Sequence, residues 1–275
     1  MADENGVPPT GGEAVAEKKR MPIWQESILL LVLAVILAVL VKTFLVQAFY
    51  IPSKSMEPGL EVNDRILVEK MSYWGSGTPQ RGDVIVFADP GGWLDANESV
   101  TATNPVTEAL SRIGLYPTGG HLVKRVIGVA GDTITCCDTR GRLHVDGVPL
   151  ESSDTWILNN SSCDGPMVAD CSWSVGPIPE GELFVMGDHR DNSADSSYHL
   201  RCTSRDGPCD ASDAYVDTDL VVGKVFARVW PADRIALVKR PEAFATLDEK
   251  IAAREEDGSY DPSASASATA TSSAS

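Results

Sequence analysis

The chain has 275 residues, long enough for one sizeable domain with terminal extensions. It carries 23 lysines and arginines against 39 aspartates and glutamates, which gives a formal net charge of −16. This acidic balance argues against nucleic-acid binding, which needs a basic face to neutralise phosphates.

An apolar run over residues 28–50, ILLLVLAVILAVLVKTFLVQAFY, follows the basic cluster KKR at residues 18–20. As a helix the run would span about 34 Å, enough for a bilayer core of about 30 Å. We expect one transmembrane helix over residues 25–50, behind a disordered cytoplasmic tail at residues 1–24. The basic cluster favours a cytoplasmic N-terminus, which places the rest of the chain on the outer face of the plasma membrane.

Two other interpretations of the run remain open. A cleaved signal peptide is also apolar, and VQA at residues 46–48 is similar to a small-x-small cleavage site. A core helix of a soluble domain fits less well, because the run has no polar face. Both the anchor and the signal peptide would export the rest of the chain.

Beyond residue 60 the sequence predicts short strands bounded by Gly, Pro and Asp. The runs that carry this prediction are residues 64–70, 82–87, 121–128, 132–145, 144–150, 181–188 and 219–230. The Asp146-Gly147 pair is a hairpin signal within them. We therefore expect a mainly antiparallel β-domain over residues 51–246.

The extensions of this domain are polar. A helix over residues 105–113, capped by Asn104, is expected within an insertion at about residues 90–120. Residues 247–275 are acidic and then rich in Ser, Ala and Thr, so that we expect a disordered tail.

Six cysteines are present, namely Cys136, Cys137, Cys163, Cys171, Cys202 and Cys209. Neither C-x-x-C nor H-E-x-x-H occurs, so that no metal site is expected. In an oxidising compartment up to three disulfides could form. We expect Cys202–Cys209 first and Cys163–Cys171 second, with several free thiols as the alternative.

The loop YIPSKSMEPGL at residues 50–60 is stiff and rich in hydroxyl groups. Pro52 and Pro58 restrict the backbone on either side of the serines, as a nucleophile and its oxyanion donors require. Ordinary turn residues would give the same composition. The chain has no G-x-S-x-G, Walker A or G-x-G-x-x-G motif, and its four histidines leave a Ser-His-Asp arrangement open.

A serine nucleophile needs a base, and lysine can be that base if burial lowers its pKa. Lys124 lies in a strand-like apolar run, where a lysine is costly, although an edge-strand lysine facing water is the alternative. Lys54 is a poorer candidate because in an extended segment it points away from Ser53 and Ser55.

Four segments, IPSKSMEP, RGDVIVF, LVKRVIGVAGD and VMGDHRDNSADS, follow the apolar run in order. In order and spacing they resemble the boxes of bacterial type I signal peptidases. The resemblance implies a membrane-anchored serine endopeptidase that removes signal peptides from exported preproteins after small residues, A-x-A, without metal or cofactor.

The resemblance also implies residue roles. Ser55 would be the nucleophile, Lys124 the general base, Ser53 and the Ser55 N–H the oxyanion donors, and Ser193 the group that orients the lysine amine. Supporting roles fall to Gly187, Asp188 and Asp195. Shallow substrate pockets that admit only small side chains would be lined by Phe49, Ile51, Met56, Leu60, Val86, Leu122 and Val123.

Three positions depart from the family pattern. Lys54 replaces a frequent glycine, Gly59 a usual threonine, and Ser197 the arginine that usually pairs with the acid at position 195. Arg190 or Arg201 could replace that arginine. His189 stands where Asn is frequent, and no catalytic role is assigned to it.

Two rival functions remain. A Ser-Lys autoprotease of the SOS-repressor type would share the dyad, but those proteins are cytoplasmic and bind DNA. A non-catalytic, membrane-anchored envelope domain would share the anchor and fold. Membrane lipid is the second expected partner besides the preprotein, and the sequence gives no oligomeric state.

Overall fold

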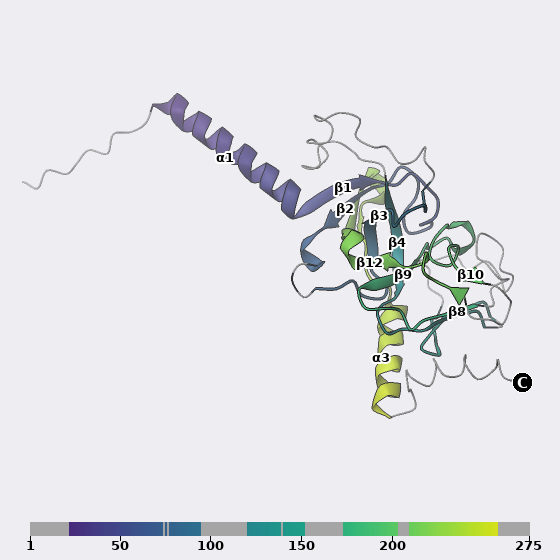
Figure 1. The fold of residues 1–275 in the computed structure, drawn as a ribbon. Helices are drawn as coiled ribbons and strands as arrows, with labels where there is room; N and C mark the ends of the chain where they lie inside the picture. The colour runs from purple at the N-terminus through teal and green to yellow at the C-terminus, as the bar shows by residue number, and fades with distance from the viewer. Residues whose placement is uncertain are drawn as a thin grey trace, which may run out of the picture. The chain divides into compact units, whose positions relative to one another are not determined.

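The computed structural model describes residues 22–73, 75, 77–94, 120–138, 140–151, 173–202 and 209–257 (Figure 1). The chain divides into two units, residues 1–39 and 40–275, and each is described by itself. The expected helix over residues 105–113 lies outside the described residues, and so does the tail from residue 258 onward.

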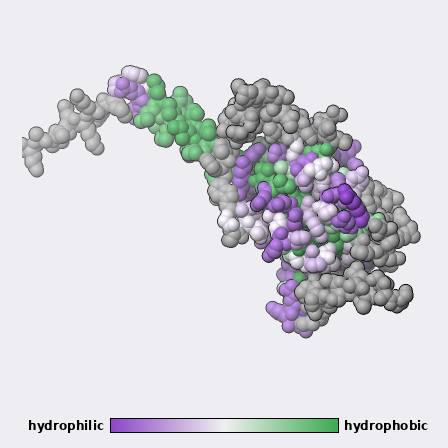
Figure 2. Space-filling model, viewed as in Figure 1, coloured by the Kyte–Doolittle hydropathy of each residue, from purple (hydrophilic) through white to green (hydrophobic). Residues whose placement is uncertain are grey.

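The N-terminal helix α1 runs from Ile23 to Phe44. Backbone N–H groups of its first turn donate to the Pro22 carbonyl, and no glycine or proline follows inside the helix. Its segment Ile23–Leu40 is long and apolar enough to cross a membrane, and none of it is buried. Figure 2 shows apolar side chains along the helix beyond its first, more polar turns.

The helix begins earlier and ends earlier than the expected 25–50. Strand β1 (Val46–Tyr50) takes the last residues of the apolar run and pairs antiparallel with β2 (Arg65–Glu69). The backbone groups of β1 therefore bond to a neighbouring strand rather than within a helix.

The main sheet has eight strands in the order β1-β2-β13-β3-β4-β9-β12, with β14 paired to β13. Its further members are β3 (Val84–Ala88), β4 (His121–Gly128), β9 (Glu182–Met186), β12 (Val216–Asp217), β13 (Val221–Trp230) and β14 (Ala236–Leu237). Every pairing described within it is antiparallel, which confirms the predicted fold class.

A smaller sheet has the order β7-β6-β5-β8. Its strands are β5 (Ile134–Cys136), β6 (His144–Val145), β7 (Val148–Pro149) and β8 (Trp173–Val175). Asp146 and Gly147 join β6 to β7 with φ of 51° and 71°, the left-handed pair that a two-residue hairpin turn requires. The Asp-Gly hairpin prediction is therefore confirmed.

Short elements complete the described part. They are the hairpin β10 (Arg201–Cys202) and β11 (Cys209–Asp210), and 3-10 turns at Met71–Tyr73, Arg190–Asn192, Thr218–Leu220 and Ala232–Arg234. The predicted Cys202–Cys209 disulfide joins the hairpin. The expected Cys163–Cys171 pair lies outside the described residues. A Cys136–Cys137 disulfide, which the sequence analysis did not anticipate, ends β5.

The centre of the main sheet is buried on both faces. Strand β3 shows this, since Val84 and Val86 pack on one face while Ile85 and Phe87 pack on the other. The first face carries the loop-side cluster, which consists of Ile51, Met56, Leu60, Ile66, Val68, Val84, Val86 and Val225. A continuous apolar run such as VIVF is what a strand covered on both faces requires.

The C-terminal prediction is corrected by helix α3 (Glu242–Glu256), which occupies the start of the expected disordered tail. Phe244, Leu247 and Ile251 form one apolar stripe that is buried against the small sheet and β9. Asp248 on α3 accepts a hydrogen bond from Arg81 at 2.9 Å. Apolar burial at this spacing stabilises a helix that its charged composition would not.

Candidate active site

The loop at residues 51–60 lies between β1 and β2, and its apolar side chains anchor it in the core of the domain. Ile51, Met56 and Leu60 are at most 2% exposed and insert into the loop-side cluster. Glu57 N donates to the Lys54 carbonyl at 3.1 Å, so that the segment turns rather than extends. These anchors fix the backbone around Ser55 before any substrate arrives.

Ser55 contacts Lys124, although 69 residues separate them in the chain. Lys124 Nζ donates to Ser55 Oγ at 2.8 Å. Lys124 comes from the central strand β4 and is 4% exposed, while Ser55 is 8% exposed. Two sequence-predicted residues thus form one buried amine–hydroxyl pair.

The electrostatic state of the Lys124 amine follows from its surroundings. Burial lowers its pKa from the ordinary 10.5 to about 8, while the nearby Asp195 and Asp188 carboxylates oppose that shift. Desolvation therefore exceeds the attraction of two anions. An amine with this pKa is partly neutral near physiological pH and can accept a proton.

Ser53 lies on the solvent side of this pair. Its Oγ is 3.2 Å from Ser55 Oγ, and its side chain is exposed. A hydroxyl at this position is free to rotate toward a negative oxygen that develops beside Ser55.

The segment after β9 closes against the loop. His189 N donates to the Ser55 carbonyl at 3.0 Å. A Cβ on Gly187 would come within 2.4 Å of both that carbonyl oxygen and Ser193 Oγ. Only glycine permits this approach of the two backbones.

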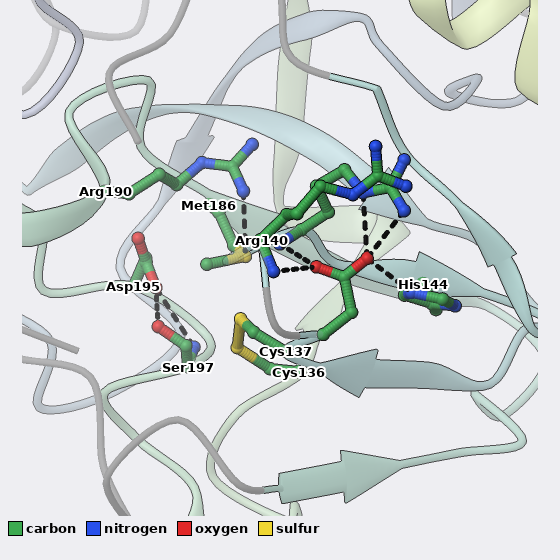
Figure 3. The surroundings of a disulfide bond; sticks show 10 residues. Cys136, Cys137, Arg140, His144, Met186, Arg190, Asp195 and Ser197 are labelled. Atoms are coloured by element: carbon green, nitrogen blue, oxygen red, sulfur yellow. Dashed lines mark hydrogen bonds and ion pairs between the residues drawn. A yellow bond between two sulfur atoms is a disulfide. The ribbon is translucent and has the colours of Figure 1, made fainter. Parts of the chain in front are cut away.

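Asp195 and Asp188 are buried and hydrogen-bonded. Asp195 accepts from Gly187 N at 2.8 Å. It also accepts from the Ser197 N–H and hydroxyl at 3.0 and 2.7 Å (Figure 3). Ser197 thus contacts the acid that an arginine usually pairs with in the family that the sequence resembles. Asp188 forms two hydrogen bonds of 2.7 Å with the buried Arg125.

Sequence reasoning missed Arg125 and left two arginines open as partners of Asp195. Arg201 is exposed and pairs with Asp213. Arg190 is 3% exposed. Burial lowers its pKa to about 10, although the nearby Asp188 and Asp195 carboxylates oppose that shift. The signal for Arg125 was available, since it is a second charge within the apolar run that carries Lys124.

Ser193 lies in the site but without the expected bond. It is 1% exposed and close to Gly187. Among the residues that the structure describes, none accepts or donates a hydrogen bond at Ser193 Oγ. Its role toward the lysine stays a prediction.

Six of the seven expected pocket residues gather beside the loop. Ile51, Met56, Leu60 and Val86 belong to the loop-side cluster, and Phe49 and Val123 pack against it. Leu122 instead packs with Ile85, Phe87 and Val126 on the other face of the sheet. Alternation along β4 separates Leu122 from Val123, so that the two cannot line the same wall.

The histidines have other contacts. His189 Nε2 lies 3.1 Å from Asp191 and its Nδ1 lies 3.3 Å from the Lys54 carbonyl. His199 stacks on Trp93 with ring centroids 4.5 Å apart. The Ser55 hydroxyl contacts Lys124 and Ser53, so that a lysine occupies the place that a triad gives to histidine.

Comparison with known proteins identifies the family. The model described as "Signal peptidase, peptidase S26" matches residues 24–230. The "Probable signal peptidase I" of Mycobacterium leprae is 39% identical over 79% of each chain. The signal peptidase I of Leptolyngbya laminosa is 33% identical over 86% of this chain and 95% of that protein. A solved signal peptidase I from Enterococcus faecalis is 24% identical, with a TM-score of 0.29, over 53% of this chain and 95% of that one. The chain therefore belongs to the signal peptidase family, peptidase S26, and is a peptidase that removes signal peptides from preproteins.

Proposed function

We propose that Ser55 is the nucleophile and Lys124 the general base of a membrane-anchored serine endopeptidase. The observation that carries this proposal is the 2.8 Å contact between the Ser55 hydroxyl and a buried amine whose pKa is about 8. A lysine in water would hold its proton at neutral pH and could not act as a base.

The proposed reaction has two halves. Ser55 Oγ attacks the scissile carbonyl carbon while its proton passes to neutral Lys124. The Ser53 hydroxyl and the Ser55 N–H stabilise the tetrahedral oxyanion, and Lys124 then protonates the leaving amine. Water, activated by the same lysine, attacks the acyl-enzyme and releases the product.

Preference for small residues in an A-x-A pattern follows from the walls beside the loop. Ile51, Met56 and Val86 are almost fully buried and close-packed, so that they offer a floor and not a deep cavity. Phe49 and Val123 are partly exposed and would contact the substrate directly. An apolar, shallow surface accepts a methyl group and excludes larger or charged side chains.

The anchor is the second part of the proposal. Helix α1 would span the plasma membrane once and contact lipid, with the basic cluster at residues 18–20 on the cytoplasmic side. The β-domain would then lie on the outer face. Ser55 follows the helix closely in the chain, which suits a substrate that is cut just beyond its own apolar segment.

Supporting roles are proposed for the segment after β9. Ser193 would orient the amine once substrate is bound, since catalytic hydrogen bonds often tighten only in the complex. Asp188 and Asp195 would tune the pKa of Lys124, and Gly187 would allow the close approach of the loop.

Cleavage of an A-x-A preprotein by the full chain in detergent tests the proposal. Ser55→Ala and Lys124→Ala should each abolish cleavage, whereas Lys239→Ala, at an exposed lysine, should leave it unchanged. An active Lys124→Ala enzyme would refute the dyad. Cleavage of its own chain alone would indicate an autoprotease, and the absence of any Ser55 acylation by an acylating inhibitor would favour a non-catalytic domain.

A further inference from the structure

Two adjacent cysteines, Cys136 and Cys137, form a disulfide at the end of β5. Cys136 is 4% exposed, whereas Cys137 is partly exposed to solvent. The reaction proposed above does not use either of them.

This disulfide has little value as a cross-link. Disulfides stabilise mainly by closing a loop in the unfolded chain, and the effect grows with loop length. Cys136 and Cys137 have a sequence separation of 1, so that their bond constrains almost no chain. The Cys202–Cys209 bond, with a separation of 7, joins two paired strands and does fit that structural role.

The disulfide lies next to the segment that carries the acids of the site (Figure 3). Cys136 packs with Met186 in one buried cluster, and Cys137 packs against that cluster. Met186 Sδ accepts a hydrogen bond from Arg190 at 3.7 Å. The next residue, Gly187, donates its N–H to Asp195, one of the two carboxylates that act on Lys124.

We propose that Cys136–Cys137 is a thiol–disulfide exchange site at which a dithiol reductant lowers the rate of cleavage. The proposal rests on the Ser55–Lys124 function argued above. A thiolate of the dithiol attacks the Sγ of Cys137, the more exposed of the two cysteines, and the Sγ–Sγ bond breaks as Cys136 leaves and takes up a proton. The second thiol of the reductant then attacks the mixed disulfide and releases Cys137 as a thiol. The protein gains two electrons and two protons, and the reductant becomes a disulfide.

Reduction of the disulfide would affect the Ser55–Lys124 site through the packing of the residues between them. Two thiols are no longer bonded and need van der Waals separation, which a close-packed core can supply only by moving neighbours. Met186 lies in the same buried cluster as Cys136 and directly precedes Gly187 of the catalytic segment. Its displacement would move Gly187 and Asp195 relative to Lys124, and with them the base.

The test uses the full chain in detergent with dithiothreitol as the dithiol. Alkylation followed by peptide mass mapping reports whether Cys136 and Cys137 are reduced, and cleavage of an A-x-A preprotein reports the rate. We expect both thiols to be alkylated in folded protein and the rate to fall about fivefold, returning on reoxidation with oxidised glutathione.

Matched variants separate this site from the other disulfide. Cys202→Ser/Cys209→Ser should keep the response to dithiothreitol, and Cys136→Ser/Cys137→Ser should lose it. An unchanged wild-type rate with both thiols alkylated would overturn the proposal, and so would a pair that resists reduction. The wild-type measurement decides even if a variant does not fold. Alkylation is measured without substrate. A chain that cleaves nothing would therefore refute the proposed function, while the peptide mass map would still show whether Cys136–Cys137 is reduced in the folded protein.

Discussion

Lys124→Met should make the protein more stable at neutral pH and inactive. The folded state lowers the pKa of Lys124 from 10.5 to about 8, so that protonated Lys124 disfavours folding. At about 1.4 kcal/mol per pKa unit this amounts to about 3 kcal/mol. Losing the hydrogen bond to Ser55 costs about 1 kcal/mol, which leaves a net gain of about 2 kcal/mol.

The gain has a defined pH window. Between pH 8 and 10.5 the unfolded state binds more protons at Lys124 than the folded state, so that wild-type stability rises with pH. The advantage of Lys124→Met should therefore be complete below about pH 8 and disappear as pH rises through 10.5. A group with an unperturbed pKa would give no such window.

Thermal unfolding of the full chain in detergent, at several pH values, measures the effect. At roughly 2–4 °C per kcal/mol we expect Tm to rise by about 5 °C at pH 7. Lys239→Met, at an exposed position, should leave Tm unchanged at every pH. A Lys124→Met protein that is less stable than wild type at pH 7, or whose advantage does not depend on pH, would refute the reasoning.

Two further predictions concern the pH dependence of cleavage in Arg190→Met and the activity of Gly187→Ala. The pKa of Lys124 is about 8, and the carboxylates of Asp188 and Asp195 oppose its lowering. Arg190→Met removes a cation beside both carboxylates, so that they should raise the pKa of Lys124 further. The acid limb of kcat/KM should therefore move upward from about pH 8 by roughly half a unit. An unmoved limb in a folded variant would contradict this. Gly187→Ala should lower kcat/KM about 100-fold, because the new Cβ would clash with the Ser55 carbonyl and displace the nucleophile. Undiminished activity would show that the close approach is not needed.

Much of the β-domain was predictable because its signals are local. The strands at residues 84–88, 121–128, 182–186 and 221–230 are short apolar runs between Gly, Pro and Asp, and the Asp146-Gly147 turn has a backbone conformation that few other pairs adopt. The pairing of Ser55 with Lys124 was expected from family resemblance. A distance between residues so far apart in the chain cannot be read from composition or periodicity.

Two of the errors have a common physical cause, since each depends on tertiary contacts. One apolar run covers both α1 and β1, and hydropathy alone cannot locate the boundary, which is set by pairing with β2. Helix α3 forms because three apolar residues are buried and because Arg81, far away in the chain, bonds to Asp248. Leu122 was grouped with Val123 although alternation separates neighbouring residues of a strand.

The buried charged groups around Lys124 affect one another. Asp188 and Asp195 would by themselves keep Lys124 protonated, since each raises its pKa. Arg125 neutralises Asp188 through two hydrogen bonds, and Asp195 is stabilised by N–H and O–H donors and by the nearby cation Arg190. Desolvation of the buried amine outweighs the attraction of the two carboxylates, so that the amine can lose its proton. We propose that a serine at position 197 is compatible with a lysine base, because the buried Arg190 would supply from the same segment the positive charge that an arginine at 197 provides in the family.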